Sequence, residues 1–251
     1  MESARKTITF FVACYNEEGL IGRTLSKLEE AIQTCKLDAE IIIIDDCSTD
    51  KSLLEIKTFA KRSKVITRTI EKNKNVGLSH NFIEALQISN GEFFRLICGD
   101  DVEPLETFIK IFSQVGKADM IIPYHTECEN KSASRKLISR IYTILINLIT
   151  GNKIKYYNGL TIASTKDFKT FCRPKLGFSF QADFICQLLE RGKTYLQIPV
   201  KTIERTKGRS SALSIQNISG ACHLFRRLLK RKIIITNEKN KRASIQFPFK
   251  A

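Results

Sequence analysis

Four isoleucines and two aspartates form the stretch Ile41-Ile42-Ile43-Ile44-Asp45-Asp46, which continues as Cys47-Ser48-Thr49-Asp50. Such a run of β-branched residues is typical of a strand buried on both faces, as in a parallel sheet. A second apolar run, Phe93–Cys98, ends in the same way at Gly99-Asp100-Asp101. Ligands of open α/β sheets bind beyond the carboxyl ends of the strands. The two acidic pairs therefore predict a site for a divalent cation and a polyhydroxylated ligand, the alternative being acids that only cap the following helices.

Strands and helices alternate along the first half of the chain. The pattern predicts strands over 7–13, 40–44, 65–70, 92–98 and 119–123, and helices over about 19–35, 50–62 and 78–89 and after Pro104. Asp46 or Ser48 is expected to cap the second helix. This alternation predicts an α/β fold with a mostly parallel, doubly wound sheet.

The second half is predicted to contain a long apolar helix followed by shorter elements. The pattern predicts a helix over 134–150, short strands within 152–165, a helical turn over 166–172, a helix over 180–191, a strand over 193–200, a basic helix at about 217–231, and then a short strand and a loosely held tail. The 134–150 helix is apolar nearly all round, begins among basic residues, and is too short to span a bilayer. We expect it to lie in a membrane interface, the alternatives being a core helix or a helix packed on a partner subunit.

The charge of the chain is strongly asymmetric. The 251 residues are 43% hydrophobic with a net charge of +15, yet residues 131–251 contain 25 of the 41 Lys and Arg and only 5 of the 26 Asp and Glu. The basic half therefore needs an anionic partner. Eight cysteines are scattered without a CxxC pair, which indicates reduced thiols in a cytosolic protein. The N-terminus has no signal-peptide layout.

Four ordered motifs in residues 7–125 resemble those of family 2 glycosyltransferases with the GT-A fold: Ala13-Cys14-Tyr15-Asn16-Glu17, Asp45–Asp50, Asn75-Val76-Gly77-Leu78 and Gly99-Asp100-Asp101. The resemblance implies an α/β nucleotide-diphospho-sugar transferase. It also implies that the nucleotide sugar is bound by Ala13, Tyr15, Glu17, Asp46, Asn75, Gly77 and Asp100.

The same resemblance implies a Mg²⁺ or Mn²⁺ ion that bridges the diphosphate of the donor. Gly99 stands where many members have the first acid of the metal motif. The metal is therefore assigned to Asp101, also the principal catalytic residue, with Asp100 and Glu103 assisting. Carboxylate and phosphate oxygens together suit such a hard cation. The alternative for Glu103 is that it only starts the helix at Pro104.

The second half resembles dolichyl-phosphate mannosyltransferases and related polyprenyl-phosphate glycosyltransferases in two segments, Gly177–Asp183 and Ile198–Ser210. This resemblance implies an acceptor phosphate faced by Arg205, Lys207, Arg209, Ser210 and Gln181. Two departures mean that the acceptor need not be dolichyl phosphate. Ser211 replaces a usual lysine, and Asn158-Gly159-Leu160-Thr161 lacks an arginine common in the family.

These observations predict an inverting glycosyltransferase. It would move a mannose- or glucose-type hexose from a GDP- or UDP-sugar to a polyprenyl phosphate at the cytosolic membrane face. It would be held peripherally by anionic lipid or by a membrane-anchored partner subunit. The alternative acceptor is a saccharide hydroxyl in polysaccharide or lipopolysaccharide synthesis, for which Asp183 is the candidate catalytic base. A remote alternative is a non-enzymatic basic protein that binds membranes or nucleic acid, but no RNA-binding aromatic motif supports nucleic acid as a partner.

We expect one GT-A domain over residues 1–215, followed by a basic helix and tail over 216–251. Within the domain, the nucleotide-sugar half covers about 1–125 and the acceptor half about 126–215.

Overall fold

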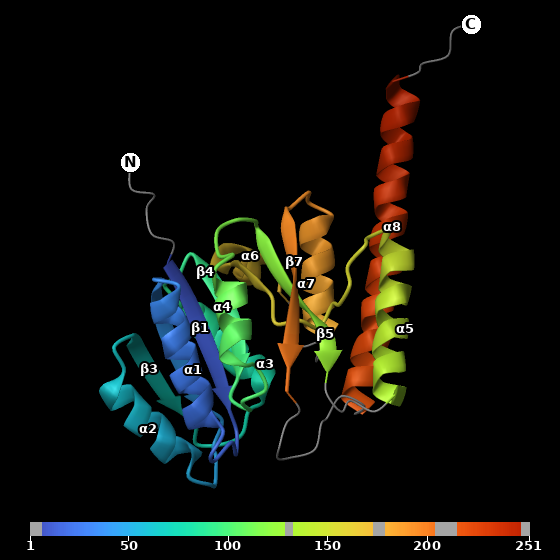
Figure 1. Cartoon of the computed structure of the whole chain (residues 1–251). Coiled ribbons are helices and arrows are strands. Elements are labelled where there is room, and N and C mark those ends of the chain that lie inside the picture. The colour runs from blue at the N-terminus through green and yellow to red at the C-terminus, as the bar shows by residue number, and fades with distance from the viewer. Residues whose placement is uncertain (1–6, 129–132, 173–178, 204–214, 247–251) are drawn as a thin grey trace, which may run out of the picture.

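The computed structural model describes residues 7–128, 133–172, 179–203 and 215–246 (Figure 1). The elements in chain order are β1 (Thr7–Cys14), α1 (Ile21–Thr34), β2 (Asp38–Asp45), α2 (Ser52–Arg62), β3 (Ile66–Glu71), α3 (Leu78–Ile88), β4 (Phe93–Cys98), α4 (Leu105–Phe112), β5 (Met120–Cys128), α5 (Ala133–Thr150), β6 (Ile162–Ser164), α6 (Thr165–Phe171), α7 (Phe180–Leu189), β7 (Tyr195–Thr202) and α8 (Ile215–Gln246).

The strands form one mixed sheet in the order β3-β2-β1-β4-β6-β5-β7. β6 is antiparallel to β4 and β5, and the other neighbouring strands are parallel. The mostly parallel α/β sheet is thus confirmed. Ile41 and Ile43 pack into the cluster on the α1, α2 and α4 side, whereas Ile42 and Ile44 pack into the cluster on the α3 and α7 side. The isoleucine run is buried on both faces because successive strand side chains point to opposite sides.

Two predictions about local structure were wrong. Asp46 and Ser48 do not cap α2, because Lys51 is its N-cap and makes no side-chain cap, while the Ser52 amide donates to Asp50 at 2.9 Å. The predicted strand and tail after residue 231 are instead the continuation of α8 to Gln246. Glycine and proline are absent from residues 221–246, so nothing in the sequence stops a helix that tertiary contacts have already started.

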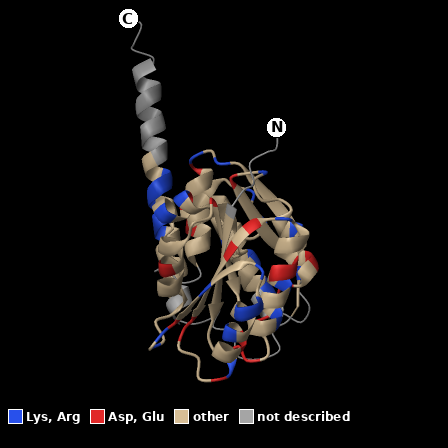
Figure 2. Ribbon diagram, turned by 90° about the vertical axis from the view of Figure 1, so that its left-hand side faces the viewer, with Lys and Arg blue, Asp and Glu red and all other residues tan. Residues whose placement is uncertain are grey.

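α5 and α8 lie side by side at the edge of the molecule that is far from β3 (Figure 1). The Tyr142 and Phe225 rings join them with centroids 5.9 Å apart. Lys and Arg recur along the coloured part of the α8 ribbon (Figure 2). Among the described residues, we find no helix with both the length and the hydropathy needed to cross a bilayer.

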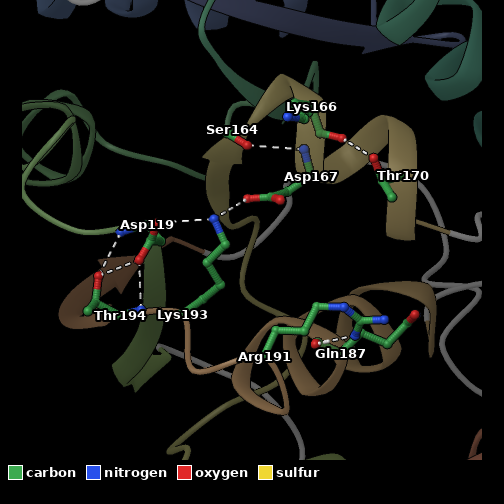
Figure 3. Close-up of polar contacts among 9 residues, drawn as sticks. All are labelled: Asp119, Ser164, Lys166, Asp167, Thr170, Gln187, Arg191, Lys193 and Thr194. Atoms are coloured by element: carbon green, nitrogen blue, oxygen red, sulfur yellow. Dashed lines mark hydrogen bonds and ion pairs between the residues drawn. The ribbon is translucent and has the colours of Figure 1, made fainter.

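Lys193 lies between Asp119 and Asp167 near the amino ends of β5, β7 and α6 (Figure 3). Its Nζ is 3.3 Å from Asp119 Oδ1 and 3.2 Å from Asp167 Oδ2. The amide and hydroxyl of Thr194 donate to Asp119 Oδ2 at 2.8 and 2.7 Å. These contacts hold the pKa of Asp119 below its usual range, mainly through the Thr194 hydroxyl. This polar cluster is structural, since it lies at the sheet edge opposite the acidic motifs.

Candidate active site

The carboxyl ends of β2, β1 and β4 bring the predicted donor residues together. Cys14 at the end of β1 pairs with Asp45 of β2, and Ala13 pairs with Cys98 of β4. The two acidic motifs therefore flank β1 on either side, and the loop after β1, beginning with Tyr15, lies between them. Tyr15 is 47% exposed, which is compatible with a ring that stacks on a base.

Hydrogen bonds tie the loop after β1 to the loop after β2. The amides of Asn16 and Glu17 donate to Ser48 Oγ at 2.9 Å and to Ser52 Oγ at 2.8 Å. In the reverse direction, the Thr49 amide donates to Asn16 Oδ1 at 2.8 Å. Both loops are consequently held in fixed positions before any ligand binds, which lowers the entropic cost of binding.

Asp46 connects this pair of loops to the turn before α3. It is buried, and its two carboxylate oxygens accept the amides of Val76 at 2.9 Å and Gly77 at 2.8 Å. Gly77 has φ +84°, which disfavours any side chain at this position. Asn75 is exposed at the same turn. A carboxylate has further lone pairs, so Asp46 retains acceptor capacity for a ligand hydroxyl.

Strained backbone is concentrated at the same edge. Of the four non-glycine residues with positive φ among those described, Asn16, Cys47 and Asp101 follow β1, β2 and β4, at 55°, 67° and 57°. Positive φ is uncommon outside glycine, and such residues cluster at functional sites. Burial raises the pKa of the neighbouring Cys14 thiol to about 12, so this thiol stays protonated and is a poor nucleophile.

Asp101, the first predicted metal ligand, is directed towards α1. Its carboxylate lies 2.9 Å from Arg23 Nε and 2.8 Å from Lys27 Nζ and is only 9% exposed. Its amide donates to Thr24 Oγ1 at 3.0 Å. Two basic side chains therefore already neutralise this carboxylate, while Asp100 is half-buried in the same turn.

Glu103, the third predicted metal ligand, is paired with a buried cation. Its Oε1 lies 2.6 Å from Nη2 of Arg95, a β4 residue with no exposed surface. Arg95 also donates to the Leu160 carbonyl at 3.1 Å and lies 5.5 Å from the Phe112 ring centroid. We did not predict this pair, although an arginine within the apolar strand 93–98 is a signal for a buried partner.

A side chain at Gly99 would be crowded. A Cβ there would lie 2.9 Å from Ile21 Cδ1 and 3.0 Å from the Ala13 carbonyl oxygen. An acid at position 99 would therefore require Ile21 and the neighbouring backbone to shift. Any metal must rely on the carboxylates that follow.

Asp183, the candidate catalytic base, and Gln181, a predicted acceptor-phosphate residue, lie on α7. Asp183 has no exposed surface, and its oxygens lie 3.1 Å from Arg227 Nη2 and 2.7 Å from Arg231 Nη1, both on α8. The side-chain Nε2 of Gln187 also donates to Asp183 Oδ2 at 3.1 Å. Gln181 is 8% exposed, and its buried Oε1 has no hydrogen-bond partner among the residues that the structure describes.

The basic acceptor residues Arg205, Lys207, Arg209 and Ser210 lie outside the described residues. The last described residue before them, Ile203, donates its amide to the Val102 carbonyl at 3.0 Å. The end of β7 is thus adjacent to the turn that carries Asp100 and Asp101.

The fold and the ordered motifs at its carboxyl edge define a glycosyltransferase of the GT-A class. The Glycosyl transferase family 2 profile matches residues 9–173, and the chain belongs to this family. Its structure resembles that of glucosyl-3-phosphoglycerate synthase from Mycobacterium tuberculosis, solved with Mg²⁺ and UDP, with a TM-score of 0.65 at 14% identity over 87% of this chain and 79% of that one. The structural neighbour supports the GT-A fold alone.

Two curated relatives differ in the acceptors that their names state. The undecaprenyl-phosphate 4-deoxy-4-formamido-L-arabinose transferase of Pseudomonas paraeruginosa is 22% identical over 84% of this chain and 62% of its own length. The poly(ribitol-phosphate) beta-glucosyltransferase of Bacillus spizizenii is 31% identical over 46% of this chain and 18% of its own length. The chain thus spans less than two thirds of either relative.

Proposed function

We propose that this protein is an inverting hexosyltransferase that uses a GDP- or UDP-sugar and a polyprenyl phosphate, acting peripherally at the cytosolic face of a membrane. The observation that carries the proposal is the hydrogen bond from Ile203 to Val102. It joins the segment Ile198–Ser210, which resembles polyprenyl-phosphate transferases, to the acidic turn of the donor site. The relative that acts on undecaprenyl phosphate supports the same acceptor class.

The donor nucleotide is assigned to the loops tied together at the carboxyl edge. Tyr15 supplies an exposed aromatic face, and Asp46 supplies carboxylate acceptor capacity beside the Gly77 turn. Glu17 is buried in the same loop, with its amide held by Ser52. Base and ribose are the parts of the donor that these groups would bind.

A divalent cation would be held by Asp101 and Asp100 of the turn after β4. The described residues contain no group of three metal-ligating side chains. Mg²⁺ is usually held by one or two carboxylates together with substrate phosphates. Asp101 would bind the cation by exchanging Arg23 or Lys27 for it, and Glu103 would assist only by leaving Arg95. When bound, the cation would neutralise charge on the departing nucleoside diphosphate.

The acceptor phosphate is assigned to Arg205, Lys207, Arg209 and Ser210, and to Gln181 of α7. A phosphate is already ionised at neutral pH, so these residues would position it for direct attack on the anomeric carbon, which inverts configuration. A general base is unnecessary in this reaction. The buried pairing of Asp183 with two arginines favours a positioning role for that carboxylate.

A saccharide hydroxyl is the second candidate acceptor. The missing arginine in 158–161 and Ser211 in place of lysine favour it, as does the relative named for glucosylation of poly(ribitol phosphate). A hydroxyl needs a base. In that case Asp183 would have to leave its arginines, or another carboxylate would serve.

The test is transfer of labelled sugar from a panel of GDP- and UDP-hexoses to a short-chain polyprenyl phosphate with Mg²⁺ or Mn²⁺. We expect label in the organic phase, and its loss in Asp100→Asn but not in the distant control Asp119→Asn. Transfer only to oligosaccharide would support the second acceptor. Lipid transfer that persists in EDTA and in Asp100→Asn would overturn the metal assignment.

A further inference from the structure

One face of α5 exposes a continuous stripe of large apolar side chains. The exposed residues are Leu137, Ile138, Ile141, Ile144, Leu145 and Leu148. Their spacing of three and four residues places them on one side of the helix, over about 17 Å of its length. The opposite side of α5 packs into the core, where Ile146 is completely buried. An exposed apolar stripe of this size on a helix indicates a binding surface for another protein or a membrane.

α8 extends this surface and fixes its position. Beside α5, it exposes Leu229, Ile233 and Ile234, while Leu224 and Leu228 pack into the core. The ion pairs of Arg227 and Arg231 with Asp183 hold α8 against α7. The two helices therefore form a surface, the α5–α8 face, with a set orientation relative to the sheet.

The charges on this face have one sign. Lys136 and Arg140 are exposed on α5, and Arg226, Lys230 and Lys232 are exposed on α8. Neither α5 nor residues 215–234 of α8 contains Asp or Glu. Apolar and cationic side chains interleaved on a helix suit an interface of acyl chains and anionic headgroups.

We propose that the α5–α8 face docks on an anionic lipid bilayer, with both helices lying in the plane of the interface. A second copy of the chain is a poorer occupant, because a twofold contact would set the lysines and arginines of one copy against those of the other. The amino ends of α5 and α8 lie at the same edge of the molecule as the carboxyl ends of β5 and β7 (Figure 1). Docking on lipid is proposed independently of the transfer reaction proposed above.

The test is flotation of the full chain with phosphatidylcholine vesicles, with and without phosphatidylglycerol, and without donor or acceptor. We expect flotation with the anionic vesicles, weakened by salt. Replacing Ile144 and Leu148 together by Gln should reduce binding about tenfold or more, since both apolar side chains are lost from the lipid contact. The matched control is Leu54→Gln, an equally exposed apolar residue on α2, which should bind like the wild type.

Absence of wild-type flotation, or equal flotation of the double variant, would overturn the proposal. Light scattering distinguishes a second copy. A wild-type dimer that becomes monomeric in the double variant, with no vesicle binding by either, would assign the face to self-association instead. Far-ultraviolet circular dichroism checks that the variants are folded. Failure of sugar transfer would leave the flotation result unaffected, so the two proposals fail separately.

Discussion

The carboxylate of Asp183 on α7 lies 2.7 Å from Nη1 of Arg231 on α8, and Asp183 has no exposed surface. Arg231 also reaches Glu190 at 3.0 Å, so one arginine joins both ends of α7 to the terminal helix. Two segments that are 48 residues apart are thus connected through buried charge.

Replacing Asp183 by Asn should destabilise the protein strongly. The change removes the countercharge of Arg227 and one of the two carboxylates that pair with Arg231, and breaking a buried pair on one side costs about 3 kcal/mol. The measurement is urea unfolding at pH 7. The double variant Asp183→Leu with Arg231→Met should recover much of the loss, since Arg227 is 39% exposed and can hydrate. Equal stability of the single variant and the wild type would contradict the buried pairing.

Asp46→Asn should weaken nucleotide binding about tenfold, through loss of one charge-assisted hydrogen bond to the Val76–Gly77 turn. The amide group would turn an NH₂ towards one backbone N–H, and the turn before α3 would open. Calorimetric titration with UDP and GDP measures this effect. Unchanged affinity for the nucleotide that the wild type binds would show that the turn is not part of the site.

Asp101→Asn should cost about 1–2 kcal/mol of stability, because Arg23 and Lys27 lose their shared carboxylate yet are partly hydrated. Asparagine is the suitable replacement because it tolerates the φ of 57°. A double-mutant cycle with Lys27→Met should give a coupling energy of about 0.5–1 kcal/mol in unfolding experiments. Zero coupling would mean that the ion pair contributes nothing in solution.

Restoring an acid at position 99 should not improve metal binding. Gly99→Asp places a Cβ against Ile21 and the Ala13 carbonyl, and overpacking of this kind costs about 1–3 kcal/mol. Gly99→Ala is the control and should be destabilised to a similar degree. Thermal unfolding gives the stability, and paramagnetic resonance of added Mn²⁺ gives the affinity. Tighter Mn²⁺ binding by Gly99→Asp would contradict the steric argument.

Asp119→Asn should lower stability at pH 7 by about 0.5–1 kcal/mol, the usual range for an exposed pair. Thr194 depresses the pKa of Asp119, so its contribution is present above the unfolded pKa of about 4 and is lost as pH falls through the lower folded value. Urea unfolding of variant and wild type should therefore differ at pH 7 and converge in acid. A difference that persists or widens in acid would contradict this linkage, and nucleotide affinity should not change.

Local patterns were sufficient to predict most elements and the edge at which the donor motifs meet. The isoleucine run and the regular alternation of strands and helices can each be recognised from the apolar pattern of a short stretch of sequence. The prediction of a strand and tail after residue 231 was wrong because Ile233–Thr236 has the amino-acid composition of a strand. The helix is stabilised by the contacts of Leu224 and Leu228 with the core. Such contacts involve residues far away in the chain.

The fold class, the family, and the position of Tyr15, Asp46 and Asp100 at one sheet edge could be predicted from the sequence, because hydrophobic period and motif order are local properties. Which charges are paired depends instead on how the elements pack. Asp101 meets Arg23 and Lys27, Glu103 meets Arg95, and Asp183 meets Arg227 and Arg231. The partner of a buried charge is whichever opposite charge the packing of helices and strands brings within about 3 Å, and that distance is not encoded in any single segment.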